Sequence, residues 1–494
     1  MSDQGTPAAP PVHETAPSSS GLPGRRYLVR GGTVLSMDPR VGDFASADIL
    51  VEGAKIVAVG RDLDASGADV IDARGRIVVP GFVDTHHHLF ETALRSFLSN
   101  GLLRDDGSGS PSADPSYTEY VLQRFAQHYR PEDVHVNALY AGLSQLDAGV
   151  TTVLDVSQIH HTPEHSDAAV QALVDTGRRS VFGYFEGDGR SGYRYPQDAH
   201  RIRKQWFPSD EGLVTMLMGG EVYLGEELYT SSWHLARELD LQIAAHAVSS
   251  AGIRPVLDDI AHGTGGTRDD IGLGPDVLLF HMTGMSDFAW RVARDAGVRV
   301  SVAAPIEMTM RHGTPPLLTL QELGMEPSLS TDVETTMTAD PFTLMRSAMT
   351  MQRMLVNERV LRQRETPPSE WPTPAPGTPP LLTVRDVLRF ATTNGAQHLR
   401  LGRRTGTLTP GKEADIVLLD ATALNVAPLN SAHGAVVSLM DRSNVDTVIV
   451  AGRIRKWRGV LLDADLGRLR HELENSRDHL FRAASIRQDL FAYS

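Results

Sequence analysis

The stretch "VVPGFVDTHHHLFETALR", residues 78–95, joins an apolar run to three consecutive histidines. Successive side chains of a strand point to opposite faces, so His86 and His88 would share one face while His87 points to the other. Two imidazoles side by side at a strand end could be a pair of metal ligands or part of a surface cluster. The fold that surrounds this strand decides between the two.

Seven further apolar runs follow the first one, with helical patterns in the gaps between them. Continuous apolar strands that alternate with helices predict a parallel sheet covered on both faces. Eight such units predict an α/β fold, a (β/α)8 TIM-like barrel, and we expect it to span residues 80–400. The seven runs begin at residues 151, 180, 213, 241, 277, 298 and 328.

The two ends of the chain share a sequence pattern that differs from that of the central part. Both have short runs of alternating apolar and polar residues, separated by Gly and Asp turn signals. We expect residues 26–79 and 401–462 to build one small β-sandwich together. The other predicted segments are a disordered tail at 1–25, a loop at 99–117 that either covers the barrel mouth or is a solvated insertion, a Pro-rich linker at 364–380 and a helical segment at 463–494.

Composition limits the possible functions. A net charge of −14 without a basic block argues against nucleic acid or an anionic membrane as partner, and favours a small-molecule substrate. The absence of cysteine excludes thiolate metal sites and cysteine nucleophiles. With no apolar run long enough to span a bilayer and no secretory signal, we expect a cytoplasmic protein, and we expect it to be a homo-oligomer.

Three more polar residues stand at the ends of predicted strands. "LQIAAH" ends in His246, "VLLFH" ends in His281 and "SLSTD" ends in Asp332. Because the carboxyl ends of barrel strands meet at one mouth, these side chains and the His-x-His pair predict a single site. Imidazoles with a carboxylate suit zinc, or ferrous iron, and leave a position for water. The alternative for Asp332 is a cap on the following helix.

The chain resembles the amidohydrolase superfamily, in particular the ATZ/TRZ group of chlorohydrolases and deaminases, over roughly residues 26–460. The most specific piece is "PGFVDTHHHL", and "AGVTTVLD", "ATTNGAQHLRLG" and "GTLTPGKEADIVLLD" support it. The resemblance implies that His86, His88, His246 and Asp332 are metal ligands. It also implies that His281 holds the attacking water and that Asp332 moves its proton.

The lysine content bears on the number of metal ions. Binuclear members of the superfamily often bridge two ions with a carboxylated lysine from the fourth strand. Only four lysines occur here, and none ends that strand, so we expect one divalent ion. Glu221, just beyond strand four, is left with three roles: a bridge to a second metal, a substrate contact, or an ordinary loop carboxylate. The four lysines are Lys55, Lys204, Lys412 and Lys456.

One position departs from the pattern of the resembling deaminases. They usually carry a glutamate three residues after the fifth-strand histidine, where it protonates the heterocycle under attack. Here "HAVS" places Ser249 there, a substrate contact at most, since serine cannot deliver that proton at neutral pH. Possible replacements are Glu221, His281, Glu186 and the histidines of "QIHHTPEH" at 158–165.

The function predicted from these residues is metal-dependent hydrolysis of a non-peptide C–N bond. The expected substrate is a cyclic amide, an amidine or an amino-substituted heterocycle, attacked by metal-activated hydroxide. The altered acid position leaves dehalogenation or decarboxylation as alternatives at the same site. A catalytically inactive barrel that serves in binding or assembly is a further alternative, against which the complete set of ligands speaks.

Overall fold

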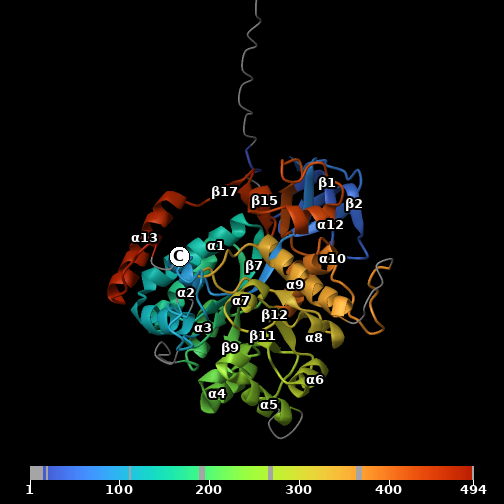
Figure 1. The fold of residues 1–494 in the computed structure, drawn as a ribbon. Coiled ribbons are helices and arrows are strands. Elements are labelled where there is room, and N and C mark those ends of the chain that lie inside the picture. Colours follow the sequence, from blue (N-terminus) through green and yellow to red (C-terminus); the bar gives the residue numbers. More distant parts are fainter. Residues whose placement is uncertain are drawn as a thin grey trace, which may run out of the picture.

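Eight parallel strands alternate with helices in the central part of the chain (Figure 1). The structure is a computed structural model and describes residues 15–17, 20–110, 113–187, 195–264, 271–362 and 370–491. The strands are hydrogen-bonded in the order β13-β12-β11-β10-β9-β8-β7-β6. The predicted (β/α)8 barrel is therefore confirmed. The strands are β6 Phe82–His87, β7 Val150–Ser157, β8 Arg179–Tyr184, β9 Val214–Gly219, β10 Ile243–Val248, β11 Val277–Thr283, β12 Arg299–Val302 and β13 Ser328–Leu329.

Helices cover the outside of this sheet because its strands are apolar on both faces. All eight residues of β7 are buried, for example. The helices of the barrel region are α1 Pro131–Asp147, α2 Pro163–Thr176, α3 Ala199–Trp206, α4 Glu226–Glu238, α5 Ile253–Gly263, α6 Asp287–Asp295, α7 Ala304–Thr309, α8 Leu317–Glu322, α9 Pro341–Arg362, α10 Val384–Arg389 and α11 Gly395–His398. Short 3-10 or π-helical segments are η1 Leu89–Leu94, η2 Tyr117–Phe125, η3 Ala126–His128, η4 Val222–Leu224, η5 Ser249–Ala251 and η6 Phe390–Asn394.

The barrel closes at the residues that the sequence assigns to the site. Strand β13 has only two residues, and a single parallel bridge joins His87 to Asp332 beyond it. The N–H of His88 donates to the carbonyl of Asp332, and the N–H of Asp332 donates to the carbonyl of His86, both at 2.9 Å. The seam of the barrel and the candidate site are thus held by the same backbone.

Both ends of the chain contribute to one mixed sheet of nine strands, as predicted for a small domain built from both ends. Figure 1 shows its first strands in blue beside its last ones in orange and red. The antiparallel pair β5–β14 joins the two halves, and residues from both halves share one core. The strands are hydrogen-bonded into one continuous sheet rather than two separate ones. They are β1 Arg26–Leu35, β2 Asp43–Glu52, β3 Lys55–Gly60, β4 Asp69–Asp72, β5 Arg76–Pro80, β14 Ile416–Asp420, β15 Val445–Val450, β16 Arg453–Trp457 and β17 Val460–Leu461.

A buried ion-pair cluster connects this sheet to the barrel. Arg179, the first residue of β8, donates to Asp415 at 2.7 Å and to Glu413 at 2.6 Å. The side chains of Arg179 and Asp415 are almost fully buried, so each charge depends on its partner. The two parts of the molecule are therefore joined by a contact in which neither charge is solvated.

The remaining segments lie around these two parts. The predicted C-terminal helical segment contains α13 Leu466–Ala483, preceded in the chain by α12 Ala432–Gly434, η7 Ala435–Leu439 and η8 Arg442–Asn444. Within the predicted linker, residues 370–380 form no helix or strand, and 364–369 lie outside the described residues. Most of the predicted N-terminal tail also lies outside them. None of the described helices is long and apolar enough to cross a membrane.

Candidate metal centre and active site

Three imidazole rings converge at the carboxyl ends of the barrel strands. Nε2 of His86 lies 3.0 Å from Nε2 of His88 and 3.1 Å from Nε2 of His246. His86 belongs to β6 and His246 to β10, so two strands far apart in the sequence bring their ends together. The ring of His86 is also stacked on Phe280, with centroids 4.1 Å apart. The three nitrogens therefore surround one small volume.

Asp332 brings a carboxylate to the same volume. Its Oδ1 lies 3.3 Å from Nε2 of His86 and 3.5 Å from Nε2 of His88. The φ angle of Asp332 is 61°, in the left-handed region that residues other than glycine rarely adopt. Backbone strain of this kind persists where the surroundings enforce it, and it is concentrated at functional sites.

His281, at the end of β11, completes the group. Its Nε2 lies 3.6 Å from Oδ2 of Asp332, and its φ angle of 69° is again left-handed. Ligand atoms of His86, His246, His281 and Asp332 all lie within 4.8 Å of one another. The structure thus brings together all five residues that the sequence assigned to metal binding and catalysis, with His281 as close as a ligand.

Two buried carboxylates orient the histidine rings from behind. Oε1 of Glu221 lies 2.5 Å from Nδ1 of His246, and its Oε2 accepts the His246 backbone N–H at 3.1 Å. Oε1 of Glu307 lies 2.9 Å from Nδ1 of His281. A carboxylate at Nδ1 holds the ring proton there and leaves the lone pair of Nε2 directed at the centre. The structure therefore places Glu221 behind a candidate ligand.

His87 points away from the centre. Its Nδ1 lies 2.9 Å from the hydroxyl of Thr331. Burial and the nearby Arg178 lower the pKa of His87 to about 3. The alternation expected along the strand is thus visible in the structure, with two rings of the triplet on one face and the third on the other.

The donor set fits a divalent metal ion. Burial, with the neighbouring imidazoles, lowers the pKa values of His86, His88 and His281 well below the usual range, so these rings are neutral. Burial also lowers the pKa of His246, but two nearby carboxylates, Glu221 first, outweigh it and raise the value. Neutral imidazoles and a carboxylate directed at one point are the ligands that zinc and ferrous iron take.

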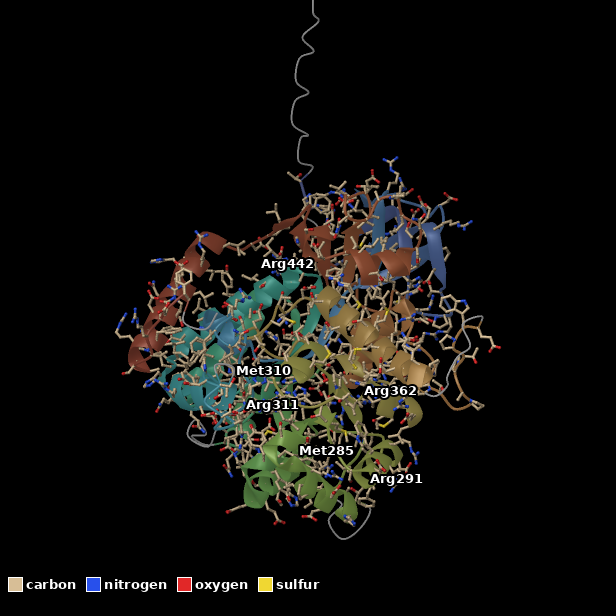
Figure 2. All side chains as sticks on the ribbon, in the orientation of Figure 1. Met285, Arg291, Met310, Arg311, Arg362 and Arg442 are labelled. Atoms are coloured by element: carbon tan, nitrogen blue, oxygen red, sulfur yellow. The ribbon has the colours of Figure 1, made fainter. Side chains whose placement is uncertain are left out.

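A cavity of about 240 Å³ opens onto this group of residues. Most of its wall is apolar. Figure 2 labels Met310, one of its wall residues, near the middle of the molecule in that view. The apolar wall residues are Leu103, Leu122, Leu224, Val248, Ala251, Ile253, Met310 and Val333, and the polar ones outside the metal centre are Arg104, Tyr117, Thr118, Gln123, Gln158, Tyr223 and His312.

Comparison with known proteins assigns the family. The sequence profile of the amidohydrolase family matches residues 77–455, which is most of the chain. The chain belongs to the amidohydrolase family. The predictions of a hydrolase that acts on non-peptide C–N bonds, and of metal-dependent chemistry, are confirmed. The candidate metal centre lies at the carboxyl ends of the barrel strands, where barrels of this kind hold their active sites.

The relatives of this amidohydrolase span nearly the whole chain. A 5'-deoxyadenosine deaminase of Methanosarcina mazei is 26% identical over 88% of this chain and 94% of its own length. A 5-methylthioadenosine/S-adenosylhomocysteine deaminase of Symbiobacterium thermophilum is 25% identical over 87% and 93%. Among solved structures, a zinc-bound adenosine deaminase of Xanthomonas campestris has a TM-score of 0.73 at 21% identity, covering 92% of this chain and 98% of that one.

Ser249 does not line the cavity of this amidohydrolase. It begins η5, and a Cβ atom added to Gly284 would lie only 2.3 Å from its hydroxyl, so the serine packs against the backbone that follows β11. The glutamate that the resembling deaminases usually carry three residues after this histidine is thus replaced by a small side chain turned toward the next strand.

The other proposed acid residues lie elsewhere. Glu186 does not line the cavity. His160 pairs with the hydroxyl of Ser166 and the carbonyl of Ser157, at 2.9 and 2.8 Å. His161 and His165 pair with backbone carbonyls of the neighbouring segment at 2.9 and 3.0 Å. The histidines of the 158–165 loop therefore hold loop structure together.

Several site residues were missed by the sequence analysis. Glu307 lies in α7 and His312 in the loop that follows it, and no strand-end pattern marks either position. Tyr117 lines the cavity from η2, and its hydroxyl donates to the buried Glu91 at 2.5 Å. Glu91 follows His88 by three residues. Of these missed residues, it is the one whose place in the sequence, close to the His-x-His pair, could have indicated a role in the site.

Proposed function

We propose that this amidohydrolase removes an amino substituent from a nitrogen heterocycle by hydrolysis at a single metal ion. The observation that carries the proposal is the convergence of the three Nε2 atoms with Asp332 at the end of a mostly apolar cavity. An apolar wall suits a flat ring, and the polar groups at its end face the carbon that is attacked. The names of the relatives, deaminases of adenosine derivatives, support the same substrate class.

His86, His88, His246 and Asp332 would hold a divalent cation, which would supply a water molecule acidic enough to serve as nucleophile at neutral pH. Burial raises the pKa of Asp332 to about 7, which His246 opposes. A carboxylate so placed can accept the proton of the attacking water and return it to the departing amine. Nε2 of His281, with its lone pair free because Nδ1 faces Glu307, accepts a hydrogen bond from the same water.

The proposal of one metal ion rests on what surrounds the centre. A bridge between two ions needs a carboxylated lysine or a free carboxylate. Lys204 lies on α3, and the other three lysines belong to the mixed sheet region. Both oxygens of Glu221 are engaged by His246. This supports a mononuclear centre, for which we propose zinc. The cytoplasmic location and the homo-oligomeric state stay predictions.

The replacement of the usual glutamate by Ser249 shapes the reaction. With no ionisable group at that position, proton transfer to the leaving group falls to Asp332 and His281. We therefore expect slow hydrolysis of ring systems that must be protonated before attack, and faster release of a good leaving group. Halide displacement and decarboxylation are the other outcomes that the assay below distinguishes.

A screen of metal-loaded protein tests this proposal. The panel contains 5'-deoxyadenosine, adenosine, guanine, an aminated triazine and its chlorinated analogue, cyclic ureas and lactams. Release of ammonia or amine from at least one aminated heterocycle, lost on chelation and regained with zinc, is the expected result. Release of chloride or carbon dioxide alone would assign the site to another reaction. No metal-dependent turnover of any compound, with well under one ion bound per chain, would identify an inactive barrel.

A further inference from the structure

His312 is a buried histidine at the wall of the cavity. The residue is 5% exposed, and its ring meets that of His281 edge-on, with centroids 4.8 Å apart and an angle of 84° between the planes. Neither of its ring nitrogens has a hydrogen-bond partner among the described residues. The ring also forms part of the cavity wall. A buried imidazole with both polar atoms unpaired at the wall of an active-site cavity requires a functional explanation.

The backbone around His312 is fixed. The hydroxyl of Thr283, the last residue of β11, donates to the carbonyl of His312 at 2.7 Å. Gly313 has a φ angle of 126°, and a Cβ atom there would lie 3.2 Å from that of Thr283. The loop therefore lies tightly against the strand that carries His281, two residues before Thr283. His312 is held in place relative to the catalytic centre.

Two buried histidines away from the metal centre, His160 and His398, have partners. His160 pairs with Ser166 and the carbonyl of Ser157, and His398 lies 2.9 Å from the hydroxyl of Ser328. If His312 served only to fill space, an apolar side chain would do so without leaving polar atoms unpaired. Its position at the cavity, rather than in the packed core, is what separates it from these histidines.

His312 and the position of the missing glutamate are both packed against the end of β11. Ser249 packs against Gly284, and Gly284 follows Thr283, which holds the His312 loop. Among the described residues that line the cavity, Asp332 is the only carboxylate. His312, with both ring nitrogens unpaired at the cavity wall, is available for a polar contact to the ring of a bound heterocycle.

We propose that His312 is a substrate-positioning residue, whose N–H donates a hydrogen bond to a ring nitrogen of the heterocycle and so places the reacting carbon over the metal centre. An imidazole carries at least one N–H in either protonation state, and the ring nitrogens of aromatic heterocycles accept hydrogen bonds in the plane of the ring. The substrate class follows from this contact: a planar heterocycle with a ring-nitrogen acceptor beside the carbon attacked. The inference rests on the proposed function for its substrate class.

Binding of purine and its 1-deaza, 3-deaza and 7-deaza analogues to zinc-loaded protein tests the proposal. Each analogue lacks one ring acceptor, and none carries a leaving group, so calorimetry measures binding without turnover. We expect purine to bind about 5–10-fold more tightly than the analogue that lacks the contacted nitrogen. His312→Leu should abolish this preference while retaining its zinc, and His312→Gln, which keeps an N–H donor, should restore part of it.

Arg311→Gln is the matched control. Arg311 precedes His312 in the same loop, lies outside the cavity wall and pairs with Asp106 at 2.5 Å, with 64% of its side chain exposed (Figure 2). This variant should keep the preference for purine. Loss of the preference in Arg311→Gln as well would assign the effect to the loop and overturn the proposal.

Two further results would overturn it. One is a preference that survives in His312→Leu, and the other is wild-type protein that binds none of the four compounds or binds them equally. Failure of the proposed function appears in a different assay, as the absence of metal-dependent amine release from aminated heterocycles. The binding assay does not depend on amine release, so a preference for purine that requires His312 can be observed even where no amine is released. The two failures are therefore distinguishable.

Discussion

At the scale of single residues, the histidine triplet contains its own control. His86 and His88 face Asp332, while His87 faces Thr331. His87→Ala should therefore retain most of the bound metal, whereas His88→Ala should lose it, as measured by elemental analysis of purified protein. Equal metal loss in both variants would show that the strand register differs, because a slip of one residue exchanges the two faces.

Glu221 provides a second prediction at this scale. Because both of its oxygens face His246, Glu221→Gln should weaken metal binding about 10–100-fold, as is typical for a carboxylate that orients a ligand. Zinc affinity measured in competition with a chelator gives this value. An unchanged affinity together with a raised KM would instead make Glu221 a substrate contact, the role it could also have had from sequence.

The residues of the metal centre could be predicted because they follow simple rules. Alternation along a strand separates His87 from its neighbours, and the convergence of strand ends in a barrel brings in His246 and Asp332. Glu307 and His312 follow no such rule. Their places depend on how the segment after β12 folds back onto β11, which is set by tertiary contacts such as the Thr283 hydroxyl.

At the scale of elements, the passage from the mixed sheet into the barrel is tightly packed. A Cβ atom at Gly81, between β5 and β6, would lie 2.0 Å from the hydroxyl oxygen of Thr151 in β7. Gly81→Ala should therefore destabilise the protein by about 1–3 kcal/mol through overpacking, as measured by denaturant unfolding.

Gly60 is the matched control for this substitution. It ends β3 and would bring its Cβ atom only to an ordinary contact, 3.6 Å from Leu63. Gly60→Ala should leave the free energy of unfolding unchanged or raise it slightly, since alanine reduces the freedom of the unfolded chain. Equal destabilisation by both substitutions would contradict the packing argument.

The elements themselves were largely predictable, and their lengths were not. The run "SLSTD" predicts the eighth strand, but β13 contains only Ser328 and Leu329, and the chain pairs again only at Asp332. A left-handed φ angle at Asp332 ends regular pairing there. Local sequence propensity does not predict the left-handed φ angle of Asp332, because closure of the barrel imposes this conformation.

At the scale of the whole molecule, the buried cluster at Arg179 joins the barrel to the mixed sheet. Arg179→Met would leave the carboxylate of Asp415 buried with its charge unpaired, so we expect a loss of about 3–5 kcal/mol in the free energy of unfolding. Arg362→Met removes an exposed pair with Glu358 and should cost at most about 1 kcal/mol. Equal losses in the two variants would show that the buried cluster contributes no more to the free energy of unfolding than an exposed ion pair does.

The arrangement of the two chain ends could be predicted only in part. Both ends have the same pattern of short strands and turns, which indicates one domain, and both contribute strands to one sheet. The order of its strands, with β5 beside β14 as the junction, depends on long-range pairing that no local pattern encodes. For the same reason the ion pairs from β8 to residues 413 and 415 appear only in the folded chain.

The central claim is that one metal ion, held by the converging histidines and Asp332, catalyses the hydrolysis. Titration of metal-free protein with zinc, with amine release from the best aminated heterocycle followed at each addition, tests it most directly. We expect no turnover without zinc, a linear rise in rate as zinc is added, and a sharp break at one ion per chain. Turnover in metal-free protein, or a rise that continues to two ions per chain, would contradict it.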